Sequence, residues 1–321
     1  MRKIFPDYLL LTLKGMAMGA ADVVPGVSGG TIAFISGIYQ ELIDTINKID
    51  FSFFKTWKNN GFKIAWQQIN GSFLLALVSG IGLSILTLSK VITHLLATQP
   101  ILVWSFFFGL VVASIYFVGK QINQWAFKTL VLFGIGTVLS YYITIAEPVG
   151  SPDSNFYLFL SGFVAIIAMI LPGISGAFIL LLMGSYAVVI GTINQLREGL
   201  IQWDTSILLQ AITKLLLFGL GAVLGLKLFS RVLHWMFDSH KNATLGLLCG
   251  FMLGSLNKVW PWKKVIATRL DSHGKEVPFL EKSILPHHFD GDNSLILAVI
   301  LMVLGFLTIF ILEKTATKFS K

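Results

Sequence analysis

The phrase Pro25-Gly26-Val27-Ser28-Gly29 returns 147 residues later as Pro172-Gly173-Ile174-Ser175-Gly176, and both copies lie inside long apolar stretches. The segments that begin with them, residues 25–47 and 172–194, are identical at 11 of 23 aligned positions. Shared apolar composition does not produce that degree of identity, so the chain contains an internal duplication. Two related halves in one apolar chain are typical of transporters, with the binding site between the halves.

The composition indicates an integral membrane protein. Hydrophobic residues make up 55% of the chain, charged residues only 12%, and the mean hydropathy is +0.78, which leaves too little polar surface for a soluble globule. The formal charge is +8, but the Lys and Arg residues stand between apolar runs, as in loops that orient a membrane protein, and this argues against nucleic-acid binding. The single cysteine, Cys249, lies in an apolar run, so we expect a packing residue and no internal disulfide.

Six apolar windows are long enough to cross a bilayer, which takes about 20 helical residues. We expect these crossings at about residues 72–90, 101–119, 127–146, 207–227, 243–256 and 294–312. Two further apolar stretches, residues 8–47 and 156–194, are each interrupted by the Pro-Gly-x-Ser-Gly phrase. Proline removes an amide donor and glycine permits a sharp turn, so each stretch predicts a re-entrant helix-break-helix hairpin. Two kinked helices, or two ordinary helices with a turn outside the bilayer, are the alternatives.

The predicted fold class is an all-α polytopic membrane protein with two inverted-topology repeats in a single integrated membrane domain. Repeat one covers residues 1–147 and repeat two residues 148–321, and each contains one hairpin and three crossings. The duplication continues past the hairpins, because residues 88–92 resemble residues 229–233. Three crossings are an odd number, so the second repeat should be upside down relative to the first.

The loop charges give an independent prediction of orientation, because short cytoplasmic loops collect Lys and Arg. The residues between the first hairpin and the first crossing include Lys48, Lys55, Lys58 and Lys63, which places this segment inside. The same rule places both termini in the cytoplasm and lets the two hairpins enter from opposite faces. The polar segment 257–293 then lies outside, where we expect a surface loop or short interfacial helices.

A helix that begins inside a membrane directs unpaired amide donors and the positive end of its dipole into the protein, which favours an anion. Serine at such a start can cap the helix and donate a hydroxyl hydrogen bond, and glycine lets a ligand approach the backbone. Phosphate suits this arrangement because several donors share its oxygens. The predicted phosphate-binding residues of the two breaks are Pro25, Gly26, Ser28, Gly29, Gly30, Thr31, Pro172, Gly173, Ser175 and Gly176.

Two ionisable residues precede the first break. Lys14 could pair with phosphate, and Asp22 could carry a proton or pair with Lys14. A charge at membrane depth is costly and therefore a functional candidate. The alternative is that Lys14 reaches the cytoplasmic interface and Asp22 caps the backbone.

Lys90 and Arg231 occupy matching positions in the two repeats, so they could guard the two cavity mouths and collect an anionic headgroup. Interfacial anchoring of helix ends is the other explanation. The six histidines show no ligand pair at helical spacing, and we expect neither a metal nor another cofactor.

The stretch from Lys14 to Thr31, followed by Gly37-Ile38-Tyr39 and Glu41, closely resembles the signature of the bacterial polyprenyl-phosphate transporter (PopT) family. The resemblance covers essentially the whole chain. It implies a flippase in the bacterial cytoplasmic membrane that returns undecaprenyl phosphate, the lipid carrier of cell-wall sugars, from the outer to the inner leaflet. It also implies that the two breaks and Asp22 belong to the site.

A compatible mechanism holds the phosphate at the helix starts near Ser28 and Ser175 while the lipid tail stays in the bilayer, and one half rocks against the other. Two other functions stay open. An intramembrane undecaprenyl-diphosphate phosphatase has a similar phrase that continues with Arg, whereas this chain has Gly29 and Gly176 there. A small-anion secondary transporter would use the same helix starts.

Overall fold

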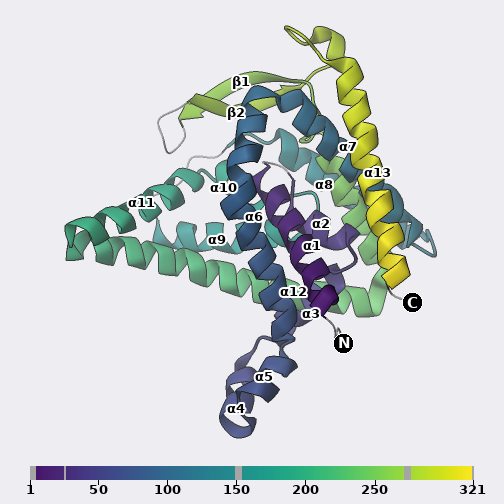
Figure 1. The fold of residues 1–321 in the computed structure, drawn as a ribbon. Helices are drawn as coiled ribbons and strands as arrows, with labels where there is room; N and C mark the ends of the chain where they lie inside the picture. The colour runs from purple at the N-terminus through teal and green to yellow at the C-terminus, as the bar shows by residue number, and fades with distance from the viewer. Residues whose placement is uncertain (1–4, 25–26, 149–153, 271–275, 320–321) are drawn as a thin grey trace.

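The computed structural model describes residues 5–24, 27–148, 154–270 and 276–319. Pro25 and Gly26, the first two residues of the first break, lie outside the described residues. The described chain is almost entirely helical, which confirms the predicted all-α membrane class (Figure 1). The helices of the first half are α1 (Phe5–Val23), α2 (Gly29–Ile35), α3 (Tyr39–Lys48), α4 (Phe51–Asn60), α5 (Phe62–Gln68), α6 (Gly71–Thr98), α7 (Pro100–Lys120) and α8 (Phe127–Ile145).

The second half repeats the broken hairpin and then departs from the first half in its later elements. Its elements are α9 (Asn155–Ile170), α10 (Gly176–Leu182), α11 (Tyr186–Gln202), α12 (Thr205–Ser255), β1 (Lys263–Leu270), β2 (Glu276–Ser283), a 3₁₀ turn η1 (Pro286–His288) and α13 (Leu295–Phe319). Both Pro-Gly-x-Ser-Gly phrases interrupt helices, one between α1 and α2 and the other between α9 and α10.

Among the described residues, four helices are long and apolar enough to span a membrane: α6, α7, α8 and α12. The short helix α10 and the next helix α11 are together long and apolar enough for one span, and the bend of 105° between them is that of a broken span or a re-entrant loop. The predicted crossings at 72–90, 101–119 and 127–146 fall on α6, α7 and α8, and the crossing at 294–312 falls on α13. The crossings predicted at 207–227 and 243–256 lie on the two arms of the single helix α12.

Helix α12 bends where those two arms meet. His240 has non-helical backbone angles (φ −144°, ψ 47°), and no proline or glycine stands in the polar segment around it. The hydroxyl of Thr244 donates to the carbonyls of Met236 at 2.8 Å and His240 at 3.0 Å, so it satisfies backbone acceptors that the bend removes from the regular ladder.

The prediction for segment 257–293 was wrong. Instead of loops or interfacial helices, β1 and β2 form an antiparallel hairpin. Lys263 at the start of β1 is partly buried, whereas residues 264–268 are all exposed. The strand therefore lacks the alternation of buried and exposed residues by which a strand with one covered face is recognised.

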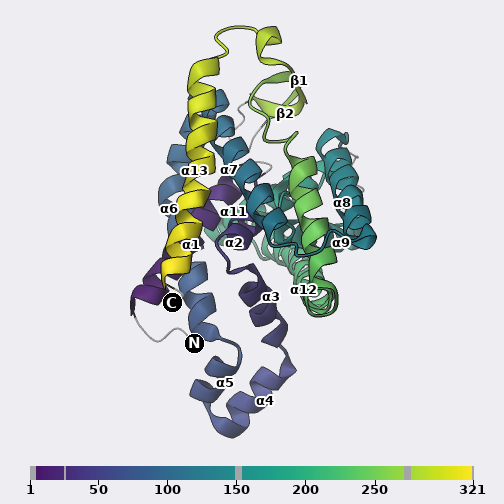
Figure 2. The ribbon, with the colours of Figure 1, turned by 90° about the vertical axis from the view of Figure 1, so that its right-hand side faces the viewer.

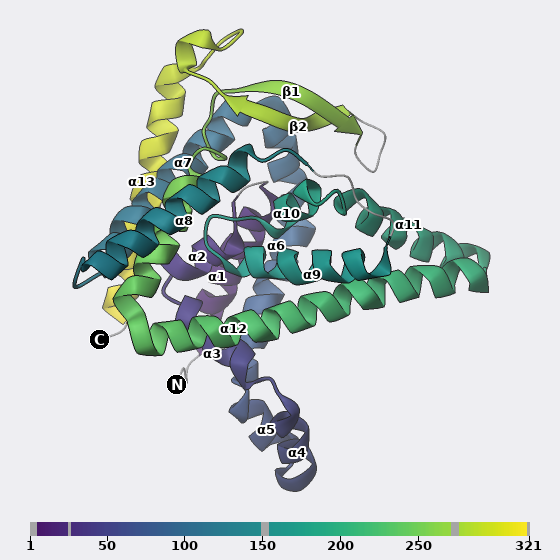
Figure 3. The same cartoon turned by 180° about the vertical axis from the view of Figure 1, so that it is seen from behind.

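The molecule has two distinct ends along the direction of α6 and α13. Helices α4 and α5 protrude at one end, where α1 begins and α13 ends, and the β-hairpin covers the opposite end (Figures 1 and 2). Helix α9 and the first arm of α12 pack together and run at a steep angle to α6 and α13 (Figure 3). The relation between these ends and the two membrane faces stays a prediction.

The duplication extends from the sequence to the helix packing. A methyl group on Gly15 of α1 would overlap the carbonyl oxygen of Leu77 on α6, and one on Gly162 of α9 would overlap the carbonyl oxygen of Phe218 on α12. Gly162 follows Gly15 by 147 residues and Phe218 follows Leu77 by 141, the two offsets of the sequence repeat. The first helix of each half, α1 or α9, therefore packs on the long helix α6 or α12 of that half through the same glycine contact.

A second glycine contact is repeated between the halves. Gly109 of α7 lies against the carbonyl of Met302 on α13, and Gly250 of α12 lies against the carbonyl of Phe133 on α8. Gly109 and Gly250 are again 141 residues apart. Small residues at such crossings let the backbones approach closely, which is a main source of helix association in membranes.

Substitution of the glycines on α6 and α12 tests this packing. Gly80→Ala and Gly221→Ala each place a methyl group on a facing carbonyl oxygen, so we expect each to destabilise the protein by about 1–3 kcal/mol. Gly82 and Gly219 lie on the same two helices with open space beside them, so Gly82→Ala and Gly219→Ala should be neutral or stabilise by up to about 1 kcal/mol. Thermal unfolding in detergent measures the difference, and equal effects within each pair would contradict the repeated contact.

Candidate functional site

The two breaks lie against each other inside the protein. The hydroxyl oxygen of Thr31, in α2, accepts a hydrogen bond from the backbone amide of Gly173 at 2.9 Å. The hydroxyl of Ser28 donates to the carbonyl of Met169 at 3.0 Å. Both side chains are almost completely buried, with 0% and 1% exposure. Side chains of the first break thus satisfy backbone groups that the second break leaves open, more than 140 residues further along the chain.

A third bond joins the halves at the start of α3. The buried phenol of Tyr39 donates to the carbonyl of Ile170, which ends α9, at 3.2 Å. Its ring packs edge to face on Phe34 of α2 and on Phe237 of α12. Tyr39 therefore holds the second break against the first hairpin with both its hydroxyl and its ring.

At the first break, the amide donors already have partners within repeat one. The amide of Gly29 donates to Asp22 Oδ1 at 2.7 Å, and the amide of Gly30 donates to the hydroxyl of Ser28 at 3.1 Å, so Ser28 is the N-cap of α2. A methyl group on Gly29 would meet the Asp22 carboxylate, so glycine is required for this approach. Asp22 thus caps the backbone in this conformation, and phosphate binding at this break stays a prediction.

The second break is built differently. Gly173 adopts φ +89°, a left-handed conformation that favours glycine. Among the described residues, none of the side chains caps the start of α10, although Ser175 occupies the N-cap position. Gly176 is half-buried and Ala177 is exposed. The position that corresponds to Asp22 is Met169, so the second helix start lacks the carboxylate of the first.

Lys14 contacts the opposite end of α2 from Asp22, which binds the amide of Gly29 at its start. Its ammonium donates to the carbonyl of Ser36, the C-cap of α2, at 2.6 Å. A cation at a helix C-terminus is favoured by the helix dipole. Helix α2 therefore has a carboxylate at its start and an ammonium at its end, both from α1. The predicted contact of Lys14 with phosphate stays untested by this geometry.

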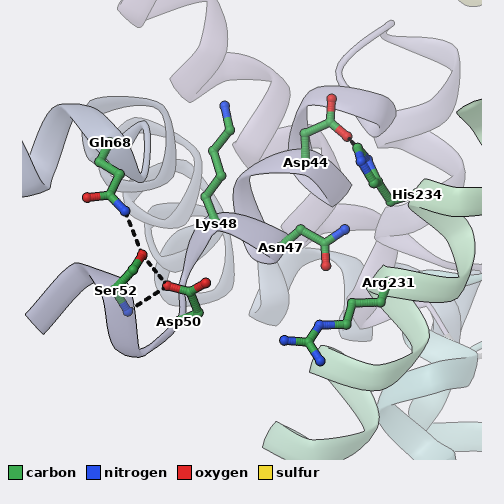
Figure 4. A pocket seen from close by; sticks show the side chains of 8 residues that line it. All are labelled: Asp44, Asn47, Lys48, Asp50, Ser52, Gln68, Arg231 and His234. Carbon is green, nitrogen blue, oxygen red and sulfur yellow. Dashed lines mark hydrogen bonds and ion pairs between the residues drawn. The ribbon is translucent and has the colours of Figure 1, made fainter. Parts of the chain in front are cut away.

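A polar pocket of about 530 Å³ opens between α3, the α4–α5 segment and α12 (Figure 4). Its lining residues come from both halves: Asp44, Asn47, Lys48, Asp50, Ser52, Gln68, Arg231 and His234. A neighbouring pocket of about 700 Å³ shares Asp44 and Lys48 with it. Of the two predicted mouth residues, Arg231 lines the first pocket, whereas Lys90 is exposed on α6 and belongs to neither lining.

The charges around this pocket are mixed. His234 bridges two carboxylates, with Nδ1 at 2.7 Å from Asp44 and Nε2 at 3.2 Å from Asp238. The amide and hydroxyl of Ser52 both donate to Asp50, and these hydrogen bonds hold the pKa of Asp50 below its ordinary value. Figure 4 shows the Arg231 guanidinium directed into the space between α3 and α12.

Sequence reasoning missed Lys227, which joins the halves at this end. Its ammonium donates to the carbonyls of Ile46 and Asn47 at the C-terminus of α3. The side-chain amide of Asn47 donates in turn to the carbonyl of Ser230 at 3.2 Å. The position of Lys227 in the apolar run of α12, which also contains Lys214, was the available signal, because a cation at that depth needs a partner.

The fold and this site define a multi-pass membrane protein of the transporter class, in which two broken hairpins meet at the centre. The model of the VCA0040-like family, described as undecaprenyl phosphate translocase-like, matches residues 18–277, and the chain belongs to this family. The relatives are transporters, which places the chain with transporters rather than enzymes.

Two curated relatives carry the same name. The polyprenyl-phosphate transporter of Vibrio cholerae serotype O1 is 43% identical over 316 residues, which cover 97% of this chain and 98% of the relative. The polyprenyl-phosphate transporter of Staphylococcus aureus is 32% identical over 264 residues, which cover 78% of this chain and 85% of the relative. No solved structure matches the chain.

The bond between Thr31 and Gly173 can be tested by a pair of similar substitutions. Thr31→Val keeps the volume but leaves the buried amide of Gly173 without its acceptor, so we expect a loss of about 1–3 kcal/mol of stability. Thr31→Ser keeps the hydroxyl and should lose less. Thermal unfolding of both variants in detergent decides, and a Thr31→Val variant as stable as Thr31→Ser would contradict the role of this bond.

Proposed function

We propose that the chain translocates undecaprenyl phosphate, or a related polyprenyl phosphate, from the outer to the inner leaflet of the bacterial cytoplasmic membrane. The observation that carries this proposal is the pair of helix breaks that face each other, of which the second has an uncapped helix start. The names of the relatives supply the substrate class. The lipid chain stays in the bilayer while the phosphate moves through the protein.

The proposed orientation places the end with α4 and α5 in the cytoplasm. This end carries Lys55, Lys58 and Lys63, as the positive-inside rule requires, and α1 begins and α13 ends there. The β-hairpin then faces the outside. The polar pocket of about 530 Å³ lies at the cytoplasmic end, so this conformation corresponds to one that is open towards the inside.

The phosphate is proposed to contact the second break. There the hydroxyl of Ser175 and the backbone of Gly176 are the candidate groups, because the first break already uses its donors for Asp22 and Ser28. After the halves rock, the headgroup leaves through the pocket beside Arg231 and Lys48. Arginine suits this step because its planar guanidinium binds phosphate oxygens in pairs.

Proton coupling through Asp22 is part of the proposal. A phosphate monoester carries about 1.5–2 negative charges at pH 7. Its inward movement opposes an inside-negative potential, at about 2.3 kcal/mol per charge per 100 mV. A proton that travels with the headgroup lowers this cost. Asp22 is the candidate carrier because protonation would also weaken its bond to the amide of Gly29.

Exposure of undecaprenyl phosphate on the outer leaflet tests the function. A probe that binds only the extracellular phosphate is applied to cells that express the native chain or the Ser175→Ala variant. We expect less undecaprenyl phosphate on the outer leaflet of cells with the native chain than on that of cells with Ser175→Ala. The stability of the variant should be native, because no capping hydrogen bond is lost. Equal exposure in all cells, with the protein confirmed in the membrane, would refute lipid translocation and favour a small-anion transporter.

Substitution of Asp22 separates proton transfer from capping. Asp22→Asn keeps an oxygen that can accept from Gly29 but cannot exchange a proton, so we expect native stability and lost transport. Asp22→Ala also removes the cap and should cost about 0.5–2 kcal/mol in addition. The same leaflet probe and thermal unfolding measure both quantities. Native transport by Asp22→Asn would reduce Asp22 to a capping residue.

A further inference from the structure

Two lysines and one glutamate form a buried cluster beneath the β-hairpin, far from the pocket of Arg231. Lys258 follows α12, Lys263 begins β1 and Glu281 lies in β2. Both ammonium groups face the same carboxylate oxygen, Glu281 Oε2, at 3.8 Å from Lys258 and 3.7 Å from Lys263. The exposed fractions of the three side chains are only 12%, 6% and 19%.

The cluster carries one more positive than negative charge. Lys263 Nζ has no hydrogen-bond acceptor among the described residues and rests 3.4 Å from the centre of the Trp104 ring. Burial lowers the pKa of Lys263 to about 7, with Lys258 adding to this effect and Glu281 opposing it. Burial also lowers the pKa of Lys258. A buried ammonium without an acceptor is costly, so an additional anion here would relieve a penalty already present in the fold.

The distances to Glu281 leave room for better acceptors. Both exceed the 2.7–3.2 Å of an ordinary N–H···O bond. One carboxylate oxygen thus faces two ammonium groups and lies too far from either for an ordinary hydrogen bond. A phosphate group has several acceptor oxygens in a tetrahedral arrangement and can satisfy two ammonium groups at once.

The cluster adjoins the second break. Lys258 Nζ lies 4.4 Å from the ring centre of Phe178, which is three residues after Ser175 in the sequence. Lys258 and Glu281 line a small cavity together with Phe178, Leu181 and Leu182 of α10. Its volume is about 10 Å³, room for one water molecule, so the site is closed in this conformation.

We propose that Lys258 and Lys263 form a binding site for a phosphate monoester anion, which Glu281 occupies until the ligand displaces it. Glu281 leaves by a rotation of its side chain, because Lys263 lies on the paired strand β1 and a movement of the whole hairpin would carry both groups away. The apolar wall from α10 suits a phosphate that carries a hydrocarbon chain. This site rests on the proposed function for its lipid ligand, since it would receive the headgroup at the outer end before the second break does.

Binding to the purified protein in lipid nanodiscs tests the site. The probes are farnesyl phosphate, inorganic phosphate and farnesol, titrated against the native chain and single variants. Lys258→Gln and Lys263→Gln should each weaken farnesyl phosphate binding by about tenfold or more, because each removes a charged hydrogen-bond donor. Glu281→Gln should strengthen it several-fold, because the competing carboxylate is gone. The exposed neighbours provide matched controls, and Lys264→Gln and Lys282→Gln should change the affinity by less than about twofold.

The pH dependence gives a second readout. Lys263 must be protonated to bind the anion, so the native affinity should fall relative to that of Lys263→Gln as the pH rises through about 7. The ionisation of the phosphate itself is the same for both proteins and cancels in this ratio. Glu281 and Lys258 are the charged groups that face Lys263, and neither is altered in this comparison.

The outcomes separate the site from its ligand and from the function. Tighter binding of farnesyl phosphate than of inorganic phosphate assigns the site to a lipid headgroup, and equal binding assigns it to free phosphate. Two results would overturn the site. One is a Glu281→Gln variant that loses stability without binding farnesyl phosphate more tightly. The other is native affinity in the two lysine variants. If Lys263→Gln fails to fold, Lys258→Gln and Glu281→Gln decide alone. The leaflet probe is read in parallel, because a native chain that leaves lipid exposure unchanged refutes the proposed function and not the anion site.

Discussion

The structure depends on the requirement that every backbone polar group away from water has a partner. A helix that ends inside the protein leaves amides and carbonyls open, and this chain breaks two of its helices there. The open groups of the second break are satisfied by side chains of the first, through Thr31, Ser28 and Tyr39. The second hairpin therefore lacks a complete set of partners without the first, and this need places the two breaks face to face.

The two halves share their helix packing but differ at the positions that carry chemistry. Asp22 corresponds to Met169, and Thr31 corresponds to Phe178. In the first half these positions cap α2 and bind the facing break, whereas Phe178 in the second half packs against Lys258. The duplication thus accounts for the similar helix packing of the two halves. The residues that differ between the halves give the first break hydrogen bonds that the second break lacks. At the second break the amide of Gly173 donates to Thr31, whereas none of the described side chains caps the start of α10.

Much of this arrangement follows from the sequence. The phrase repeated at Ser28 and Ser175 predicts both helix breaks, and the same offsets recur in the contacts of Gly15 and Gly162. The pairing of Thr31 with Gly173 does not follow, because a sequence repeat shows which segments correspond and not which atoms meet. The β-hairpin was missed because residues 264–268 of β1 are all exposed and show no alternation of buried and exposed positions. The single carboxylate shared by two lysines arises only when β1 and β2 pair.

The two ends of the molecule differ in the volume of their cavities. Pockets of about 530 and 700 Å³ lie at the end with α4 and α5, whereas the cavity beneath the β-hairpin holds about 10 Å³. In the proposed mechanism, opening the end beneath the β-hairpin requires the hydrogen bonds between the breaks to loosen. Each has a net value of about 0.5–1.5 kcal/mol, so the three together amount to only a few kcal/mol. That sum is similar to the work of moving one charge through 100 mV, about 2.3 kcal/mol. In the proposed mechanism, a bound anion or a proton on Asp22 would therefore be enough to shift the balance between the two conformations, without any rearrangement of the glycine-packed helices.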